Sequence, residues 1–460
     1  KVNAFSDLNF SLRLLVLYHM TLFSDDKRQC FPIPSNRFSR LVNLGSMAAG
    51  IAGNIFLSAS QQFTKGQNTN LKDLVLSQSN MLRFVKHLSQ MRGAAMKVGQ
   101  LLSLEVGEFI SPQASEILSL LRNQAHAMPP DQLNSVLEKN WGPNFNERFE
   151  KFDPQPIAAA SIGQVHRCIT KNGTLLAIKV QYPGIRDSIE SDIKNLKFLL
   201  KTIGLIPPLI DFDSLMEAGK DQLYLETDYL AEADFLESFG RLVANLEVFE
   251  VPRVYRPLST SNVLAMEFKE GITLDKASTL TPLQKNNLIY NVMKLLFAEI
   301  FDFKLIQTDP NFSNFLYQEE REKIVLLDFG ATQKITPDLS NKFRTLLQAT
   351  WRNDKADIKT ALTDLNILHA SFPPHFVEIF MEIFLDVTKP IREKKTFNFK
   401  EIKIIEKIES HAQEIISHQK KIKVPDMDTL LIQRKVGGLF FLAKHLRASI
   451  DLNKLLKKYV

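Results

Sequence analysis

The stretch that decides the fold is Gln307-Thr308-Asp309-Pro310-Asn311-Phe312-Ser313-Asn314, which is followed along the chain by Leu327-Asp328-Phe329-Gly330. The two stretches contain a carboxylate at Asp309, an amide at Asn314, and a second carboxylate, Asp328, directly before Phe-Gly. In this order the first carboxylate can orient an attacking oxygen, while the amide and the second carboxylate hold the metal ions that neutralise phosphates. The pattern predicts a site for Mg²⁺ (or Mn²⁺) with ATP or ADP.

A lysine upstream adds to this pattern. Lys179 lies in Ala177-Ile178-Lys179, in an alternating apolar run behind the Lys171-Asn172-Gly173 turn, which predicts a β-hairpin. A strand lysine taken alone is more often solvated, but one that precedes the two stretches in this order is predicted to contact the α- and β-phosphates. The sequence therefore predicts an α+β, protein-kinase-like fold with two lobes, a small β-sheet N-lobe and a larger helical C-lobe.

Residues 158–164 occupy the place of the glycine-rich phosphate loop of a kinase. Only Gly163 is a glycine, and the Cβ atoms of the other residues restrict the approach of backbone amides to phosphate. We therefore expect an unusual mode of nucleotide binding, and a helix N-terminus, which alanine favours, stays open as an alternative. The predicted nucleotide-binding set is Ala158, Ala159, Ala160, Ser161, Ile162, Gly163, Gln164, Lys179, Glu267 and Phe268.

Three acids, Glu226, Asp228 and Glu232, lie close together between the hairpin and the Asp309 stretch. On a helix Asp228 and Glu232 would share a face, where their like charges destabilise the helix unless cations pair with them. One acid can pair with Lys179, and Lys97 is a candidate cation for the others. For an isolated helix, a solvated acidic face would be the better interpretation.

Composition excludes several classes of protein. The 460 residues are 45% hydrophobic and 23% charged, as in a globular protein of two or three packed units. A net charge of +6 fits an anionic nucleotide or an anionic membrane surface and is too weak to indicate nucleic acid. Zinc-hydrolase, P-loop and dinucleotide-binding motifs are absent from the sequence. Cys30 and Cys168 have no metal-ligand spacing and predict no disulfide scaffold.

The chain divides into five expected segments. Residues 1–37 are an N-terminal segment in which a targeting remnant is weakly indicated, because acids accompany the arginines. Residues 38–60 are uncharged after Arg40 and fit either a membrane-associated helix or a soluble one. A helical extension over 71–145 contains the Lys-x-Gly-Gln motif, with Pro129-Pro130 ending its helical pattern. The N-lobe covers 146–269 and the C-lobe 270–460.

Periodicity within the lobes predicts the individual elements. Helices are expected at about 187–203 and 214–246, and short strands near 251–256, 262–268 and 324–327.

A family resemblance rests on four stretches together: Lys97-Val98-Gly99-Gln100, Ala158–Gln164, Glu226-Thr227-Asp228 and Gln307–Asn314. In combination they resemble the UbiB-type atypical kinases, also called the ADCK family, and within it the mitochondrial branch required for coenzyme Q (ubiquinone) biosynthesis. The resemblance covers roughly residues 35–460.

The resemblance implies a kinase-like fold with an N-terminal helical extension over the active site. Lys97 and Gln100 would reach into the cleft as regulatory or occluding residues. Glu226 and Asp228 would form the acidic pair that contacts Lys97. The implied catalytic residues are Asp309, Lys179 and Glu232, with Glu232 paired to Lys179, and the implied metal ligands are Asn314 and Asp328.

The same resemblance implies ATP hydrolysis coupled to the assembly of ubiquinone-biosynthesis enzymes or to membrane extraction of ubiquinone intermediates. The expected location is the matrix face of the mitochondrial inner membrane. Expected partners are ATP, the biosynthetic enzyme complex, anionic phospholipid and lipid-like phenolic precursors, while a homodimer stays open and nucleic acid is not expected.

The stretch after Gly330 separates three hypotheses. The chain passes Pro337-Asp338 into a helical pattern without Ala-Pro-Glu, so the platform on which a kinase docks peptides is missing. This favours an ATPase or small-molecule kinase over a protein kinase. A nucleotide-responsive scaffold or lipid-binding module is the third hypothesis.

Overall fold

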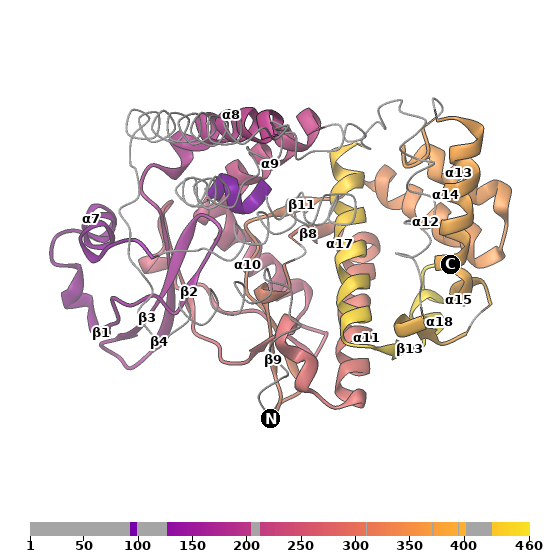
Figure 1. The fold of residues 1–460 in the computed structure, drawn as a ribbon. Helices are drawn as coiled ribbons and strands as arrows, with labels where there is room; N and C mark the ends of the chain where they lie inside the picture. Colours follow the sequence, from indigo (N-terminus) through magenta and orange to yellow (C-terminus); the bar gives the residue numbers. More distant parts are fainter. Residues whose placement is uncertain are drawn as a thin grey trace, which may run out of the picture.

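The computed structural model of the chain describes residues 93–98, 127–203, 212–309, 311–369, 372–393, 395–401 and 426–460. The predictions for 1–37, for 38–60, for Gln100 and for most of the extension at 71–145 lie outside these residues. Figure 1 shows a sheet-bearing part with β1 to β4 at one end and a helical part with α12 to α15 at the other, as the α+β two-lobed prediction requires.

The first sheet is antiparallel and five-stranded, in the order β1-β3-β4-β6 with β2 on β3. A hairpin joins β3 to β4, and Gly173 in its turn has a φ of +79°. All residues of β4 after Leu175 are buried, so both faces of this strand are covered. The strands are β1 (Phe149–Phe152), β2 (Ala158–Ala159), β3 (Gly163–Thr170), β4 (Leu175–Gln181) and β6 (Val263–Glu267).

Four helices accompany this sheet: α7 (Pro130–Trp141), α8 (Ile185–Ile203), α9 (Phe212–Glu226) and α10 (Tyr229–Leu242). The single helix expected over 214–246 is wrong, because Asp228 ends the run and caps a new helix by accepting from the Ala231 N–H. Pro129 is the N-cap of α7 and Pro130 its first residue, a position where proline loses no hydrogen bond. The helical pattern that the two prolines were expected to end lies mostly outside the described residues.

The strand expected over 251–256 is also wrong. Only an isolated bridge joins Val254 to Met266, and the regular strand β5 (Phe249–Glu250) ends before Pro252, which has no N–H for a ladder. The β5 strand pairs in parallel with β10 (Lys323–Leu326), the strand that leads to Asp328.

Small sheets and helices build the second part of the molecule. Its sheets have the orders β5-β10-β9-β7, β11-β8 and β12-β13. The further strands are β7 (Ile272–Thr273), β8 (Leu305–Gln307), β9 (Phe315–Gln318), β11 (Thr332–Lys334), β12 (Phe397–Asn398) and β13 (Ser449–Ile450). The helices are α11 (Pro282–Ala298), α12 (Pro337–Arg352), α13 (Lys355–Asp364), α14 (Pro374–Val387), α15 (Lys389–Arg392), α17 (Met427–His445) and α18 (Leu452–Leu456).

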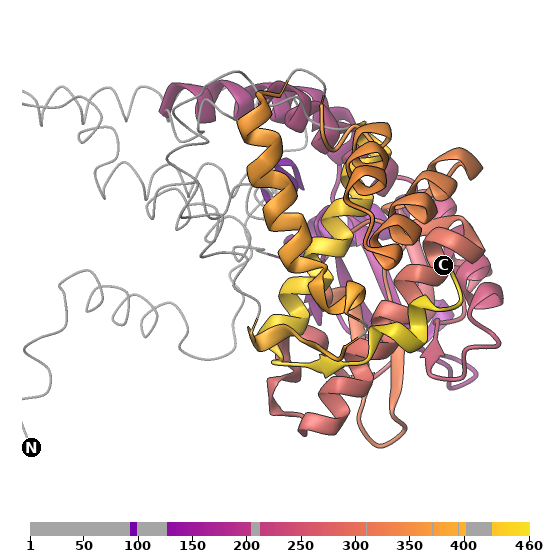
Figure 2. The same cartoon turned by 90° about the vertical axis from the view of Figure 1, so that its right-hand side faces the viewer.

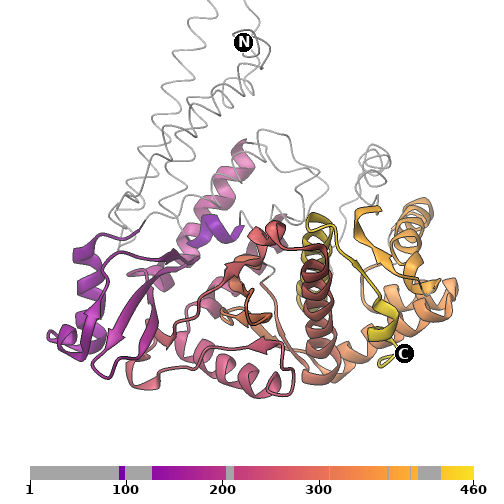
Figure 3. The same cartoon turned by 90° about the horizontal axis from the view of Figure 1, so that it is seen from below.

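The helix α17 runs beside α11, and Figure 3 shows the two in contact along the middle of the molecule. Figures 1 and 2 place α12 to α15 on the side of α17 that faces away from the five-stranded sheet. No helix within the described ranges has the length and apolarity to cross a bilayer.

The two parts share one hydrophobic core. Phe329, from the Asp-Phe-Gly stretch, is buried against Phe239 of α10, with ring centroids 4.5 Å apart. This contact fixes the segment of Asp328 to the helix that carries Glu232, so the fold brings the two acids toward the same strand.

Candidate active site

Lys179 stands at the centre of the site and joins three elements. Its Nζ lies 2.8 and 3.0 Å from the two carboxylate oxygens of Glu232 and 3.2 Å from Oδ2 of Asp328. Glu232 comes from the first turn of α10, and Asp328 follows β10 after one intervening residue. The structure thus brings Lys179, Glu232 and Asp328 together although they lie far apart in the sequence.

One ammonium group cannot balance two carboxylates, and the pKa values reflect this. Burial lowers the pKa of Lys179, but Asp328 and Glu232 outweigh it and hold that pKa well above its usual value. Burial raises the pKa of Asp328, yet Lys179 and the Gly330 N–H reverse the effect, so the net shift is downward. For Glu232 burial prevails over Lys179 and raises the pKa to about 7. Asp328 is therefore the more firmly ionised of the two acids.

Asp309 is positioned by the short ladder between β8 and β11. Thr308 donates to the Ala331 carbonyl twice, from its backbone N–H at 2.8 Å and from Oγ1 at 2.6 Å. These bonds hold Asp309, the next residue, beside the Asp-Phe-Gly stretch. The Asp309 carboxylate accepts from the Asn311 N–H at 3.2 Å and from Asn314 Nδ2 at 3.5 Å.

Asn314 and Asp328 lie at one end of the β9–β10 hairpin. Phe315 pairs with Leu326, and the Leu327 N–H donates to the Asn314 carbonyl at 2.9 Å. Carboxylate and amide oxygens suit Mg²⁺, which takes few protein ligands and completes its shell with water and substrate phosphates. The described residues contain no cluster of three or more His, Cys, Asp or Glu side chains that could hold an ion alone. The Asp328 carboxylate and the Asn314 amide are groups of this kind, so the residues present fit Mg²⁺ that arrives with a nucleotide.

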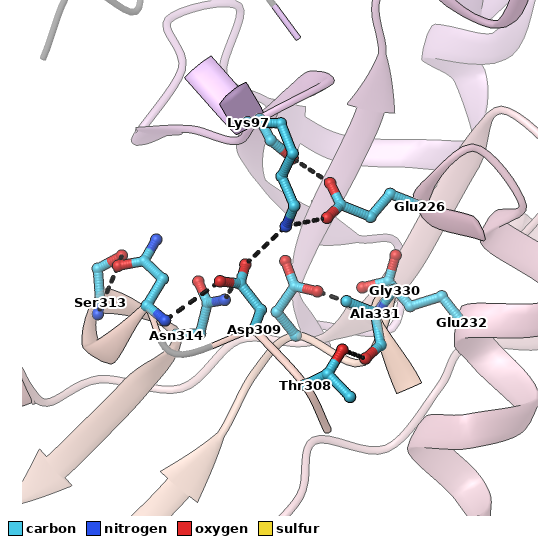
Figure 4. Close-up of polar contacts among 12 residues, drawn as sticks. Lys97, Glu226, Glu232, Thr308, Asp309, Ser313, Asn314, Gly330 and Ala331 are labelled. Carbon is cyan, nitrogen blue, oxygen red and sulfur yellow. Dashed lines mark hydrogen bonds and ion pairs between the residues drawn. The ribbon is translucent and has the colours of Figure 1, made fainter. Parts of the chain in front are cut away.

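Lys97 reaches this site from the short helical segment 93–98. Its side chain is fully buried, with Nζ 2.5 Å from Glu226 Oε1 and 3.6 Å from Asp309 Oδ2. Figure 4 shows it pointing between these two acids. Burial lowers the pKa of Lys97, but Asp309 and Glu226 outweigh burial and raise it, so the ammonium stays charged beside Asp309.

The acids near Lys97 differ from the expectation in one respect. Glu226, the last residue of α9, contacts Lys97 and also accepts from Ser161 Oγ at 2.6 Å. Asp228 is exposed, and one of its carboxylate oxygens caps α10. The expectation that Asp228 pairs with Lys97 is therefore wrong. Asp309 takes that place instead. Gln100 lies outside the described residues.

The alanine-rich segment forms the tight connection between the paired strands β2 and β3, which excludes the helix N-terminus considered above. Ala158 and Ala159 form β2, and the Ala160 N–H donates to the Gly163 carbonyl at 2.8 Å. Ile162 is buried in the core, and the Gln164 side chain accepts from the Met128 N–H and contacts His166.

Gly163 has a structural reason of its own. A Cβ atom there would lie 2.4 Å from the Val180 carbonyl oxygen and 2.8 Å from the Tyr229 hydroxyl. The protein itself therefore needs a glycine at this position, whether or not phosphate approaches.

Glu267 is the last residue of β6, and Phe268 follows it. The Glu267 N–H donates to the Arg253 carbonyl at 2.8 Å, and the Phe268 N–H donates to the Leu175 carbonyl at 3.2 Å. The Glu267 carboxylate pairs with Lys269. Because the N–H groups of both residues already donate hydrogen bonds, a nucleotide base at these residues would have to bond to carbonyl oxygens or side chains.

Two buried residues beside the site were missed from the sequence. Glu299 follows α11, and Lys435 lies on α17; their side chains form a buried ion pair. A lone acid in the apolar run 295–301 was a signal for Glu299. The sequence carries no signal that pairs it with Lys435.

Comparison with known proteins identifies the family of the chain. The ABC1 atypical kinase-like domain matches residues 120–362. The chain is 35% identical to the mitochondrial atypical kinase COQ8 of Saccharomyces cerevisiae over 93% of its own length and 85% of the relative's. It is 33% identical to the mitochondrial atypical kinase COQ8B of Danio rerio, over 90% of the chain and 67% of that relative.

A solved structure supports the fold. The complex of Rv3197 with erythromycin, from Mycobacterium tuberculosis, superposes with a TM-score of 0.55 at 20% identity, covering 81% of this chain and 93% of that one. Given the matched domain, the relatives and the kinase-like fold, the chain belongs to the ABC1 atypical kinase-like family and is an ATP-dependent enzyme of the kinase class.

Proposed function

We propose that the protein binds Mg²⁺ and ATP in the cleft between Lys179 and Asp309 and uses ATP hydrolysis in support of ubiquinone (coenzyme Q) biosynthesis. One observation supports this above all: the Lys179 ammonium joins Glu232 to Asp328, while the Lys97 ammonium lies against Asp309. The contacts of Lys179 are those expected in a kinase nucleotide site. The contact of Lys97 with Asp309 would restrict the space where an acceptor binds.

The residues divide the work by charge. Lys179 would hold the α- and β-phosphates, kept in place by Glu232. Asn314 and Asp328 would hold Mg²⁺, which when bound neutralises the phosphate oxygens. The backbone of residues 158–164 would cover the phosphates, with Glu267 and Phe268 at the edge that faces the base. We also propose lobes that divide near residue 270 and an extension, carrying Lys97, that covers the cleft.

Asp309 would act on the attacking oxygen. Its carboxylate would accept a hydrogen bond from water and hold that water in line with the γ-phosphorus. The oxygen of water forms a bond to phosphorus as the bond to the β–γ bridging oxygen breaks. The products are ADP and inorganic phosphate, and the water proton passes through Asp309 to solvent or phosphate.

Two features favour water or a small acceptor over a protein. The fully buried Lys97 lies 3.6 Å from the Asp309 carboxylate, where a protein hydroxyl would have to enter. Residues 331–336 alone join Gly330 to α12, so a peptide-docking platform has no room in this connection.

The cellular setting follows from the relatives and the family resemblance. Four relatives at 31–35% identity are named mitochondrial atypical kinases. We propose the matrix face of the mitochondrial inner membrane as the location, with the ubiquinone-biosynthesis enzymes, anionic phospholipid and phenolic precursors as partners. We keep a homodimer open, and propose no nucleic acid partner.

The test is ATP turnover by the full chain, measured with and without anionic liposomes and a phenolic ubiquinone-precursor mimic. We expect Mg²⁺-dependent phosphate release that rises when both are present and falls at least ~100-fold in Asp309→Asn, the loss typical of removing a catalytic base. Phosphate transfer to a protein library that exceeds transfer to water would favour the protein-kinase alternative. Turnover that Asp309→Asn leaves unchanged would overturn the assignment of Asp309.

A further inference from the structure

The helix α11, which precedes β8 and Asp309 along the chain, ends in an unusual way. After Ala298, α11 continues as a single π-helical turn, Glu299–Phe303, and stops at Lys304, whose φ of 50° is left-handed. Single π-turns are rare and recur at functional sites. Here the turn places the Glu299 side chain toward β8, the strand that precedes Asp309.

Glu299 holds an amide that the sheet leaves free. Thr308 donates its N–H to Ala331 across the β8–β11 ladder, and because amides alternate along a strand, the Gln307 N–H points away from β11. Glu299 Oε1 accepts this N–H at 3.4 Å. The bond fixes the backbone two residues before Asp309.

Lys435 of α17 completes the arrangement. Its Nζ contacts the other oxygen of Glu299, and the two side chains are 4% and 1% exposed. Lys435 also lies within electrostatic reach of Asp309, which acts to raise its pKa, although burial prevails and lowers that pKa. A buried pair of this kind rarely adds net stability over apolar residues, so a positional role accounts for it better than a stabilising one.

We propose that Glu299 and Lys435 are a positioning pair for Asp309, through which the C-terminal helix α17 holds β8, the strand that directly precedes the segment with the reacting carboxylate. This inference rests on the proposed role of Asp309. The pair touches neither nucleotide nor acceptor. Its effect should therefore appear in the chemical step, with nucleotide binding unchanged.

The experiment uses the full chain and separates position from stability. Lys435→Met alone leaves the Glu299 carboxylate buried without its cation, so it should lower both Tm and kcat. Glu299→Met with Lys435→Met removes both charges at similar volume, so Tm should return to within a few degrees of the unmodified protein. The Gln307 N–H still lacks its acceptor in this double variant. We expect its kcat to stay at least ~10-fold low, with the KM for ATP and the Mg²⁺–ATP thermal shift unchanged.

A matched control comes from the same π-turn. Asp302 pairs with Lys458, their side chains are 35% and 64% exposed, and within the described residues no hydrogen bond or ion pair joins either of them to β8. Lys458→Met should leave kcat unchanged. Wild-type kcat in the double variant, with Asp309→Asn inactive, overturns the positioning pair and leaves the proposed function standing. Full turnover in Asp309→Asn overturns both.

Discussion

Nζ of Lys97 lies 3.6 Å from Oδ2 of Asp309, so a fully buried ammonium group occupies the space beside the carboxylate that would orient an attacking oxygen. The same ammonium contacts Glu226, which Ser161 also holds. The helical segment 93–98 is thereby connected to the alanine-rich segment, to α9 and to the Asp309 loop through one side chain.

The first prediction concerns this contact. Lys97→Met leaves the Glu226 carboxylate buried without a cation, which should cost about 3–5 kcal/mol of unfolding free energy. Lys97→Met with Glu226→Gln keeps an acceptor for Ser161 and should regain most of the loss.

In that double variant the Lys97 ammonium group no longer lies beside Asp309. Autophosphorylation, measured as incorporation of labelled phosphate, should rise, and the preference between ATP and ADP in thermal shift should change. A stable double variant with the original nucleotide profile and the original incorporation would show that Lys97 does not restrict the cleft.

The second prediction concerns the metal. Asp328→Asn replaces the more firmly ionised acid beside Lys179 with a neutral amide, so the Mg²⁺-dependent part of the ATP thermal shift should be largely lost. Removal of Mg²⁺ by a chelator should have the same effect on the unmodified chain. Asp338→Asn, an exposed surface acid paired with Lys342, is the control and should keep the full shift. An Asp328→Asn protein that keeps it would exclude Asp328 as a ligand.

The third prediction is a pH dependence of stability. Burial raises the pKa of Glu232 from 4.5 to about 7, so the folded state binds a proton that the unfolded state has already released in this range. The resulting stabilisation is present below about pH 4.5 and is lost as pH rises through about 7, by up to about 3 kcal/mol. Glu232→Gln should lack this loss.

Urea unfolding of both proteins across this range measures the difference. The unfolding free energy of the unmodified chain should fall relative to that of Glu232→Gln between pH 4.5 and 7. A constant difference across the range would contradict the raised pKa.

The fourth prediction tests the alanine-rich segment. Gly163→Ala would place a Cβ atom 2.4 Å from the Val180 carbonyl, a backbone atom in the middle of the sheet, so β3 and β4 must separate. We expect a loss of about 2 kcal/mol or more, the range of overpacked cores. Gly437→Ala is the matched control: its Cβ meets nothing within 4 Å inside α17, and helix propensity should add about 0.5–1 kcal/mol. Differential scanning calorimetry of the two variants measures the change in Tm. An unchanged Tm in Gly163→Ala would contradict the close approach of Gly163 to the Val180 carbonyl.

The sequence was sufficient to predict the relative positions of groups whose separation is set by local structure. That Asp309, Asn314 and Asp328 would lie near one another could be predicted, because a hairpin and a short ladder, both local structures, set their separation. The two-lobed fold followed from their order after Lys179. The length of the connection after Gly330 could also be predicted, since Pro337 begins α12.

Contacts between distant segments could not be predicted in this way. Asp228 and Glu226 are equivalent in the sequence, and only the start of α10 decides that one caps a helix while the other meets Lys97. Lys435 lies 136 residues from Glu299, and its role depends on how α17 packs against α11. Gly163 was explained by phosphate approach, whereas its neighbours in the sheet already require it.

The charge balance around Lys179 and Lys97 has a consequence for substrate entry. Four carboxylates, those of Glu226, Glu232, Asp309 and Asp328, surround these two ammonium groups, so this cluster is acidic overall. A bare nucleotide tetra-anion would meet repulsion there, whereas a divalent ion would be drawn in. We expect this charge balance to favour entry of the Mg²⁺–nucleotide chelate over entry of the free nucleotide, before any phosphate is positioned.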